Sequence, residues 1–469
     1  MQAEGRREIP YNYTSADDRQ VLVFLLGAEA WATFESLRDQ RVTGRSARLL
    51  LRVLGEFFLI RRNPYVYDEL LASPVSRRRF ASQVRHDLAV VEAKALGNAA
   101  VLGLVRQSRS LLEGLLEELR LAPARRAKIR SALGPIVGSA NLSFDPFALI
   151  SHATDATDWR LHLPYAVALP TREEQVAPLL AEIGRLGLKA VARGAGTGLT
   201  GGAVPLAPEV VVINTERLNR VIGLGRGEAG GVDRVWLDVE AGCVTETAIH
   251  AAKEGGFVFA TDPTSEWACT IGGNIAENAG GKTAVLWGTA VDNLLSWRMA
   301  LPDGRRIIVE RLGHPGRKIL EADLLRFRLS DEAGLGLGTV ELRGSELRKK
   351  GLWKDITNKA LSGLPGLQKE GTDGVITGAR FILHRPYERK ATICLEFFGE
   401  DMEDASRVIL EMTAAFENGG EETLMALEHF DEEYVEAVDY RTKASRGGRP
   451  KAVLLVDLVA HDEGQLERG

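Results

Sequence analysis

The chain has 469 residues, of which 45% are hydrophobic and 26% are charged, and its formal net charge is −5. This size allows roughly two to four domains, and the balance is typical of a globular protein. A slightly acidic chain gives no general case for nucleic-acid binding, so no nucleic-acid partner is expected. Cys243, Cys269 and Cys394 are scattered without a CxxC pair, which favours neither a disulfide framework nor a metal site.

Residues 1–140 are expected to form a helical domain. Leucines recur at helical spacing, most clearly at Leu111, Leu112, Leu115, Leu116 and Leu119. Pro64, Pro74 and Pro123 are interpreted as helix boundaries. Clustered arginines such as Arg77, Arg78 and Arg79 are interpreted as solvated helix faces. The alternative is a docking surface for an acidic partner or anionic lipid headgroups.

The sequence indicates a cytoplasmic location. No apolar run approaches the about 20 residues that a membrane-spanning helix needs. The polar N-terminus lacks the charged and apolar regions of a secretory signal. Peripheral association with the inner face of the membrane is left open.

Residues 141–388 are expected to form an α+β domain, because β-branched runs alternate with helical stretches. Thr171 and Glu174 have the spacing of a capping box for a helix over 172–186. The stretch from about 311 to 365 shows no clear organisation. The other elements expected are strands at 165–169, 189–192 and 210–214, a hairpin of 221–224 with 235–239, a helix at 245–255 and a turn at 301–304.

Residues 389–469 are expected to begin a further α/β domain. The pattern predicts a strand at 391–398, a helix at 402–418 and strands near 425–427 and 452–456. The chain stops soon after the last of these, so this domain is expected to be incomplete.

Two glycine-rich segments carry most of the functional information. The first glycine loop, residues 193–202, reads RGAGTGLTGG, and the second glycine segment, residues 262–281, runs from DPTS through TIGGN to NAGG. Glycine allows positive φ angles and close approach of the backbone to a ligand. Successive N–H groups can then converge on an anion. Together the two segments predict one large phosphate-bearing cofactor held at more than one point.

Two other nucleotide-binding patterns are rejected. The run 223–227 lacks the third glycine of a dinucleotide fingerprint and falls inside the expected hairpin. The chain contains no GxxxxGK[ST] sequence, so a P-loop is excluded on pattern.

Four motifs in order identify a family resemblance. They are the first glycine loop, the second glycine segment, Trp287-Gly288 with residues 301–304, and EGTDGVIT at residues 370–377. The last of these, EGTDGVIT, is called the third motif below. The four motifs resemble the FAD-binding domain of the FAD-linked oxidase superfamily, which has the vanillyl-alcohol oxidase / p-cresol methylhydroxylase fold. The branch resembled is that of D-lactate dehydrogenase and glycolate oxidase. Nearly the whole chain also resembles the amino-terminal part of large bacterial FAD/iron–sulfur oxidoreductases. The resemblance implies a helical N-terminal domain, a two-subdomain FAD-binding domain and the start of a substrate cap.

The resemblance also implies FAD and its contacts. Thr197 stands where covalent members of the family have a histidine, so FAD is expected to bind non-covalently. Val375 and Ile376 are expected to lie against the cofactor as a strand edge. Glu277 and Asp373 depart from the usual pattern, and Glu277 is interpreted as a solvated charge. The residues implied at the cofactor are Arg193, Gly194, Gly196, Thr197, Gly198, Gly201, Gly202, Pro263, Thr264, Ser265, Thr270, Gly272, Gly273, Asn274, Asn278, Gly280, Gly281, Gly288, Val375 and Ile376.

The function implied is FAD-dependent oxidation of a small D-2-hydroxy acid, and D-lactate is the first substrate candidate. The electrons are expected to pass to a cytochrome, quinone or iron–sulfur acceptor. The sequence identifies no catalytic residue and no metal ligand. The family's HxGDGN motif is absent, so the chain alone is expected to turn over hydroxy acids poorly or not at all. The alternatives are an alkyl-glycerone-phosphate synthase-like flavoenzyme and a non-catalytic FAD-binding electron-transfer subunit.

Overall fold

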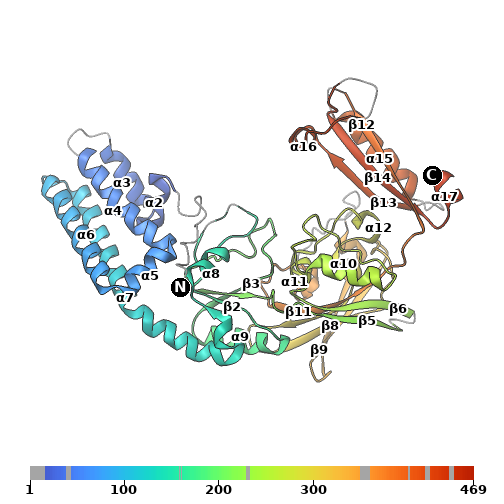
Figure 1. Ribbon diagram of the computed structural model, residues 1–469, viewed down its shortest axis with the longest axis horizontal. Coiled ribbons are helices and arrows are strands. Elements are labelled where there is room, and N and C mark those ends of the chain that lie inside the picture. Colours follow the sequence, from blue (N-terminus) through green and yellow to red (C-terminus); the bar gives the residue numbers. More distant parts are fainter. Residues whose placement is uncertain are drawn as a thin grey trace, which may run out of the picture. The chain divides into compact units, whose positions relative to one another are not determined.

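The computed structural model describes residues 16–38, 44–157, 159, 161–228, 233–348, 360–399, 402–417, 423–442 and 448–468 (Figure 1). The chain divides into two compact units. One comprises residues 1–168, 182–191 and 204–213, and the other comprises 169–181, 192–203 and 214–469. The domain boundaries predicted at residues 140 and 388 stay predictions. No helix in the described ranges combines the length and apolar character needed to cross a bilayer.

The N-terminal region is helical, as predicted. Side-chain caps explain several starts: Asp17, Asn63, Ser73 and Asn98 accept hydrogen bonds from the first free N–H groups of the helices that follow them. The helices are α2 (Asp18–Leu26), α3 (Ala28–Arg38), α4 (Gly44–Arg62), α5 (Pro64–Ala72), α6 (Pro74–Lys94) and α7 (Ala99–Val137).

The prolines divide into two groups. Pro64 and Pro74 begin α5 and α6, which confirms the predicted boundaries. Pro123 lies inside α7, so its interpretation as a boundary is wrong. The buried stripe of α7 continues on both sides of Pro123, from Leu119 to Ile129. Burial of that stripe offsets the cost of an interior proline, which is about 3 kcal/mol.

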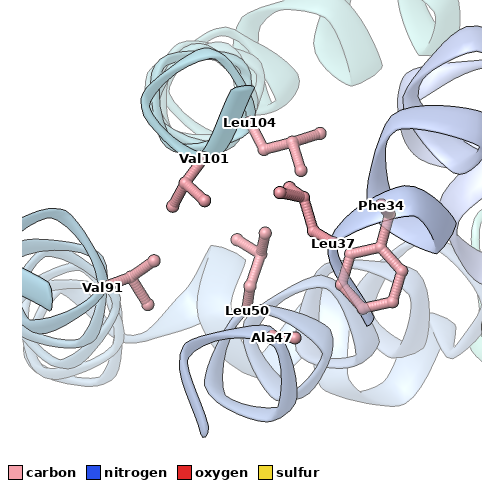
Figure 2. Close-up of a pocket in the computed structure, with 7 residues that line it drawn as sticks. All are labelled: Phe34, Leu37, Ala47, Leu50, Val91, Val101 and Leu104. Atoms are coloured by element: carbon pink, nitrogen blue, oxygen red, sulfur yellow. The ribbon is translucent and has the colours of Figure 1, made fainter. Parts of the chain in front are cut away.

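The helices enclose an apolar core with one small void. The void has a volume of about 10 Å³ and lies between α3, α4, α6 and α7 (Figure 2). Its lining is wholly apolar, which disfavours water, and its size admits no ligand. The residues that line it are Phe34, Leu37, Ala47, Leu50, Val91, Val101 and Leu104.

A four-stranded sheet follows, with strand order β1-β2-β4-β3. The helix expected at 172–186 begins later, because the Gln175 side chain accepts the N–H groups of Thr171 and Arg172. A 3₁₀ turn, η2 (Glu173–Gln175), therefore precedes α9 (Val176–Arg185). The strands are β1 (Leu142–Ser143), β2 (Ala166–Ala168), β3 (Lys189–Arg193) and β4 (Val210–Asn214), with η1 (Ser139–Asn141) and α8 (Pro146–Ser151) beside β1 in sequence.

A seven-stranded antiparallel sheet forms the larger part of the second unit, in the order β10-β9-β8-β7-β11-β6-β5. The predicted hairpin and the turn at 301–304 are confirmed. The unorganised stretch contains the β9–β10 hairpin, while residues 349–359 lie outside the described residues. The strands are β5 (Val221–Glu228), β6 (Asp233–Glu240), β7 (Leu294–Ala300), β8 (Arg306–Leu312), β9 (Leu324–Asp331), β10 (Gly336–Arg343) and β11 (Val375–Ile382).

The two faces of this sheet differ in chemistry. One face packs into a hydrophobic core with α10 (Thr245–Glu254) and α11 (Ile271–Glu277). The other carries ion pairs that link side chains of the sheet to one another and to η2. Arg298, for example, pairs with Glu173 at 2.9 Å and with Asp238 at 3.0 Å. Short helical turns complete this region: α12 (Ala284–Trp287), α13 (Ala290–Asn293), α14 (Gly344–Leu347) and η3 (Leu361–Gly363).

The C-terminal part forms a three-stranded antiparallel sheet in the order β12-β14-β13. Helix α15 packs on one face through Val408, Ile409 and Met412. The predicted strands and helix of this region are therefore confirmed, with shifted ends. The elements are β12 (Arg389–Phe397), α15 (Glu403–Glu417), β13 (Thr423–Phe430), α16 (Glu432–Ala437), β14 (Ala452–Ala460) and α17 (Glu463–Arg468).

Candidate cofactor site

The first glycine loop leaves β3 at Arg193 and offers a set of free N–H donors. Gly196 and Gly201 have φ angles of +73° and +82°, a conformation that favours glycine. Across residues 194–202, no main-chain N–H donates to any residue that the structure describes. The loop is half-buried to exposed over most of its length. Its donors can therefore reach an anionic ligand.

The structure brings the two glycine segments into contact. A Cβ atom on Gly194 would overlap Oγ1 of Thr270, the residue that caps α11. A Cβ atom on Gly196 would overlap the guanidinium of Arg193, which is only 9% exposed. Glycine at these two positions is therefore required by close packing within the protein.

The start of α11 is engaged inside the protein. The N–H groups of Ile271 and Gly272 donate to the carbonyl oxygens of Cys243 and Ala241, at 3.0 and 2.7 Å. A Cβ atom on Gly272 would lie 2.9 Å from that of Ala241. This end of the helix thus has fewer free donors than the glycine pattern suggests. Gly273 is less confined, since its nearest neighbour would be Oγ1 of Thr270 at 3.4 Å.

Asn274 has a mainly structural environment. Its side chain is 2% exposed, and Nδ2 donates to Oγ1 of Thr245 at 2.7 Å. Asn278 adopts a left-handed conformation, and its Oδ1 accepts the N–H of Val291 at 3.0 Å. Both asparagines hold the second glycine segment in shape, and a direct contact with FAD stays a prediction for each.

The beginning of the second glycine segment forms a compact turn. Pro263 accepts the N–H of Glu266, and Ser265 accepts those of Ala268 and Cys269. Thr264 is exposed and Ser265 half-buried, so both hydroxyl groups remain accessible.

Asp262 is a titratable group that the sequence pattern did not reveal. Its Oδ1 accepts the hydroxyl of Thr283 at 2.7 Å. Burial raises the pKa of Asp262 to about 6, although the Thr283 hydrogen bond and the charge of Lys282 oppose that shift. A Cβ atom on Gly281 would overlap the Asp262 carbonyl, so the two ends of the segment are packed together.

Glu277 links the first glycine loop to the third motif. Oγ1 of Thr200 lies 3.2 Å from both carboxylate oxygens of Glu277. A Cβ atom on Gly202 would lie 3.1 Å from Glu277 Oε1 and 3.2 Å from Cβ of Glu370. Glu277 is half-buried and hydrogen-bonded to Thr200, so its interpretation as a solvated charge stays a prediction. Sequence pattern alone could not pair residues 77 positions apart.

The third motif closes the end of α11. The N–H of Glu370 donates to Ala276 at 3.0 Å, and that of Gln368 donates to Ile275 at 3.1 Å. Asp373, the other departure from the family pattern, accepts the N–H of Gly366 at 2.9 Å and so holds the preceding turn. The first glycine loop, the second glycine segment and the third motif thus converge around α11.

Val375 and Ile376 begin β11 and pair with Ala300 and Met299 of β7, whereas the pairing of β11 with β6 starts only at Gly378. They are 3% and 6% exposed. Their contact with the cofactor as a strand edge stays a prediction. Only the family resemblance indicated a strand here, and strand order depends on pairings between residues far apart in sequence.

Gly288 lies against a buried polar network. Its φ is +77°, and a Cβ atom would overlap the Asp292 carboxylate. Asp292 accepts the N–H groups of Thr289 and Ile319 and pairs with Arg348. Arg311 donates to the carbonyl of Val291 at 3.2 Å, and burial lowers its pKa to about 10. A Cβ atom on Gly280 would lie 2.9 Å from Thr289 Cγ2, so this network also confines the NAGG turn.

A second polar cluster, which sequence analysis missed, lies on β12 and β14. Asp457 accepts Lys390 Nζ at 2.7 Å and Thr392 Oγ1 at 2.6 Å. Burial alone would raise the pKa of Asp457, but these hydrogen bonds and the charges of Lys390 and Lys282 lower it. Since Lys282 also acts on Asp262, the cluster lies near the second glycine segment.

Apolar packing confirms that proximity. Met425 of β13 and Val459 of β14 share a cluster with Ala260 and Trp287. The sheet face that carries Lys390 and Asp457 therefore borders the segment between the second glycine segment and Gly288.

These residues fit a dinucleotide cofactor. The first glycine loop supplies free N–H donors, and its glycines let the backbone approach a ligand. Residues 193–202 include neither histidine nor cysteine, so no covalent bond to a flavin can come from this loop. Asn274, Val375, Thr270 and Ile376 are among the most buried of the predicted contacts, at 2%, 3%, 4% and 6% exposure.

Comparison with known proteins agrees with this geometry. The family profile described as FAD binding domain matches residues 164–310, and the one described as Protein of unknown function (DUF3683) matches residues 4–117. Glycolate oxidase subunit GlcD of Escherichia coli (strain K12) is 36% identical over 178 residues, 38% of this chain and 33% of the relative. D-2-hydroxyglutarate dehydrogenase of Xanthomonas citri pv. viticola is 35% identical over 157 residues, 34% of this chain and 32% of the relative. The match thus spans about a third of these relatives' length.

Solved structures show the same fold. An alkyldihydroxyacetonephosphate synthase aligns with a TM-score of 0.50 and 16% identity over 74% of this chain and 57% of that chain. The 4-ethylphenol oxidase from Gulosibacter chungangensis aligns with a TM-score of 0.51 and 17% identity over 74% of this chain and 61% of that chain. At these identities the likeness concerns the fold alone. The predicted α+β fold is confirmed.

Proposed function

Residues 164–310 belong to the FAD-linked oxidase superfamily, whose cofactor is FAD, and from this premise we propose that the chain serves the oxidation of a D-2-hydroxy acid. The observation that carries the proposal is the first glycine loop, with free N–H groups over residues 194–202. We propose that these groups bind the pyrophosphate of FAD without a covalent bond. When bound, FAD supplies hydride-accepting chemistry.

The protein's part is to hold the cofactor and orient the substrate. In our proposal, Thr197, Gly198 and Gly201 approach the pyrophosphate, while Thr264 and Ser265 offer hydroxyl groups from the second glycine segment. The link between Thr200 and Glu277 fixes the loop against α11. Preorganised donors of this kind bind an anion without first reordering the chain.

The charge near the second glycine segment supports an anionic substrate. Lys390 pairs with Asp457, and the charge of Lys282 acts on both Asp457 and Asp262, so two ammonium groups stand beside two carboxylates. We propose that these ammonium groups attract the carboxylate of a 2-hydroxy acid. Because the Asp262 and Asp457 carboxylates are close by, they repel a monocarboxylate less than a dicarboxylate, so D-lactate is our first candidate, ahead of 2-hydroxyglutarate.

We propose that the electrons leave to a cytochrome, a quinone or an iron–sulfur partner. The proposed setting is the cytoplasm, with the protein at the inner face of the membrane. Relatives named glycolate oxidase and D-2-hydroxyglutarate dehydrogenase support the substrate class and leave the acceptor open.

Anaerobic titration tests the proposal. The purified chain, reconstituted with FAD, is mixed with D-lactate, glycolate or D-2-hydroxyglutarate, and flavin absorbance near 450 nm is followed to equilibrium so that a slow reaction is not missed. We expect D-lactate to bleach the flavin most fully. Bound flavin that none of the three acids bleaches would contradict the proposal and favour an electron-transfer subunit.

A paired variant tests the substrate site. Lys390→Gln together with Lys282→Gln should raise the D-lactate concentration needed for half-reduction by about tenfold or more, because two partly exposed charge contacts are lost. The control is Arg326→Gln with Arg328→Gln, which removes two charges from β9, where both arginines pair with glutamates. Equal effects of the two double variants would argue against a local carboxylate site.

A further inference from the structure

Charge is distributed very unevenly along this chain. Residues 1–140 contain 22 arginines and lysines and 15 aspartates and glutamates, a net charge of +7. The remaining residues contain 37 and 49, a net charge of −12. The small net charge of the whole protein thus hides a cationic helical region, and such a region attracts anionic surfaces.

Within the helical region, one side of α6 is strongly basic. Residues 77–86 include four arginines, one histidine and no carboxylate. The buried side of α6 contains Ala81, Val84 and Leu88. Helical spacing places Val75, Arg78, Arg79, Ser82 and His86 on the opposite side, and all five are exposed. We call these five residues the basic face of α6.

The arginines of this segment differ in their partners. Arg85 pairs with Glu113 at 2.8 Å, and Arg77 donates to the carbonyl oxygens of Leu70 and Leu71. By contrast, Arg78 and Arg79 form no ion pair or side-chain hydrogen bond with any residue that the structure describes. Two exposed guanidinium groups without a partner among the described residues therefore lie on one turn of α6.

We propose that the basic face of α6 binds the anionic phospholipid headgroups of a membrane. Guanidinium groups match phosphate oxygens in a bidentate geometry. Basic clusters on a helix surface are attracted to the negative potential of anionic lipids. Val75, 65% exposed one turn before the arginines, adds an apolar side chain of the kind that enters the headgroup region.

The shape of the surface favours a bilayer over an acidic protein. Helix α6 has 21 residues. At a rise of 1.5 Å per residue it extends about 30 Å, and its exposed side offers a straight row rather than a pocket. This face contains no carboxylate, so its charged groups are cationic, and Ser82 and His86 are its other polar side chains. Each arginine near an anionic surface contributes a factor of about five to the affinity.

Vesicle binding of the full chain tests the inference. Co-sedimentation is measured with vesicles of pure phosphatidylcholine and of phosphatidylcholine with 30% phosphatidylserine, at low and high salt. We expect binding to the anionic vesicles only, and its loss at high salt, because exposed charges are screened within about 10 Å at 0.1 M. Arg78→Gln with Arg79→Gln should weaken binding about 25-fold.

The matched control is Arg326→Gln with Arg328→Gln, which changes the net charge equally while leaving α6 intact. It should bind anionic vesicles like the wild type, and both double variants should keep the wild-type unfolding temperature. Equal binding to both vesicle types would overturn the inference, as would undiminished binding of the α6 variant. Binding of the chain to heparin without binding to anionic vesicles would also overturn it, in favour of another polyanion. None of these outcomes depends on whether the protein contains FAD, so they are independent of the proposed function.

Discussion

The hydroxyl of Thr200 lies 3.2 Å from both carboxylate oxygens of Glu277, and this contact joins the first glycine loop to the end of α11. It places a negative charge beside the N–H groups that we propose for the pyrophosphate. The carboxylate therefore has two opposite effects. It orders the loop, and it repels an anionic ligand.

Replacing Glu277 by glutamine separates these effects. The amide oxygen can still accept the Thr200 hydroxyl, but the negative charge is gone. We expect FAD to bind about two- to fivefold more tightly, since a partly exposed charge interaction of this kind is worth up to about 1 kcal/mol. Fluorescence titration of the apoprotein with FAD measures the change. Thr200→Val, which removes the contact and keeps the charge, should instead weaken binding. An opposite order of affinities would show that Glu277 does not face the bound anion.

Gly272 and Gly198 should respond differently to a side chain. A valine at 272 would press on Ala241, and overpacking at such a site typically costs about 1–3 kcal/mol. At Gly198 an added Cβ would lie 3.5 Å from Glu277, an ordinary contact. We therefore expect Gly272→Val to lower the unfolding temperature and Gly198→Ala to leave it nearly unchanged. Thermal unfolding of the apoproteins measures both, and a stable Gly272→Val protein would contradict the packing.

Asp262 should make stability depend on pH in a defined direction. Burial raises its folded pKa to about 6, above the ordinary value of 3.8. The folded state then binds a proton more tightly than the unfolded state, so this contribution is largest near pH 4 and is lost as pH rises to 6. Asp262→Asn removes the titration. Relative to the wild type, the variant should gain up to about 3 kcal/mol above pH 6 and little near pH 4.

Urea unfolding between pH 4 and 8 measures this difference. Asp303→Asn is the control, because Asp303 is exposed and hydrogen bonds from Arg305 lower its pKa instead. A difference between Asp262→Asn and the wild type that does not vary with pH would refute the raised pKa.

The three thiols should differ in reactivity. Cys243 and Cys269 are buried, and burial raises the pKa of Cys243 to about 11, so little thiolate forms near neutral pH. Cys394 is exposed on β12. We expect one thiol to react quickly with DTNB in the folded protein and three after unfolding. Cys394→Ser should abolish the fast reaction, and its persistence would place a buried cysteine at the surface.

Much of this architecture could be predicted from local sequence. Periodicity located the helices of the N-terminal region, because burial of one helix face leaves a regular pattern, and a continuous β-branched run located β4, which is buried throughout. Pro123 was wrongly interpreted as a helix boundary, because proline disfavours a helix locally but burial of α7 in the tertiary structure outweighs that cost. The interior position of β11 could not be read from Val375 and Ile376, since pairing partners lie far away in sequence.

In the site, too, local sequence predicted some features, whereas contacts between distant residues determine the others. Glycine spacing identified both cofactor segments, yet it did not distinguish a glycine that approaches a ligand from one that packs against the protein. Gly272 belongs to the second kind, because its neighbour Ala241 comes from the end of β6. The Asp457–Lys390 pair was missed because two strands separated by α15 and β13 bring it together.

The connection between β3 and β4 has a mechanical consequence for the first glycine loop. The N–H of Lys189 donates to Glu209 at one end of the two strands, and the N–H of Thr215 donates to Arg193 at the other. The loop between them must therefore return along the full length of the strands, and both of its ends are clamped to the same sheet. A force that a bound ligand exerts on the loop therefore acts on both strands at once. The backbone hydrogen bonds at the ends of β3 and β4 share that force, and no single hinge takes it up.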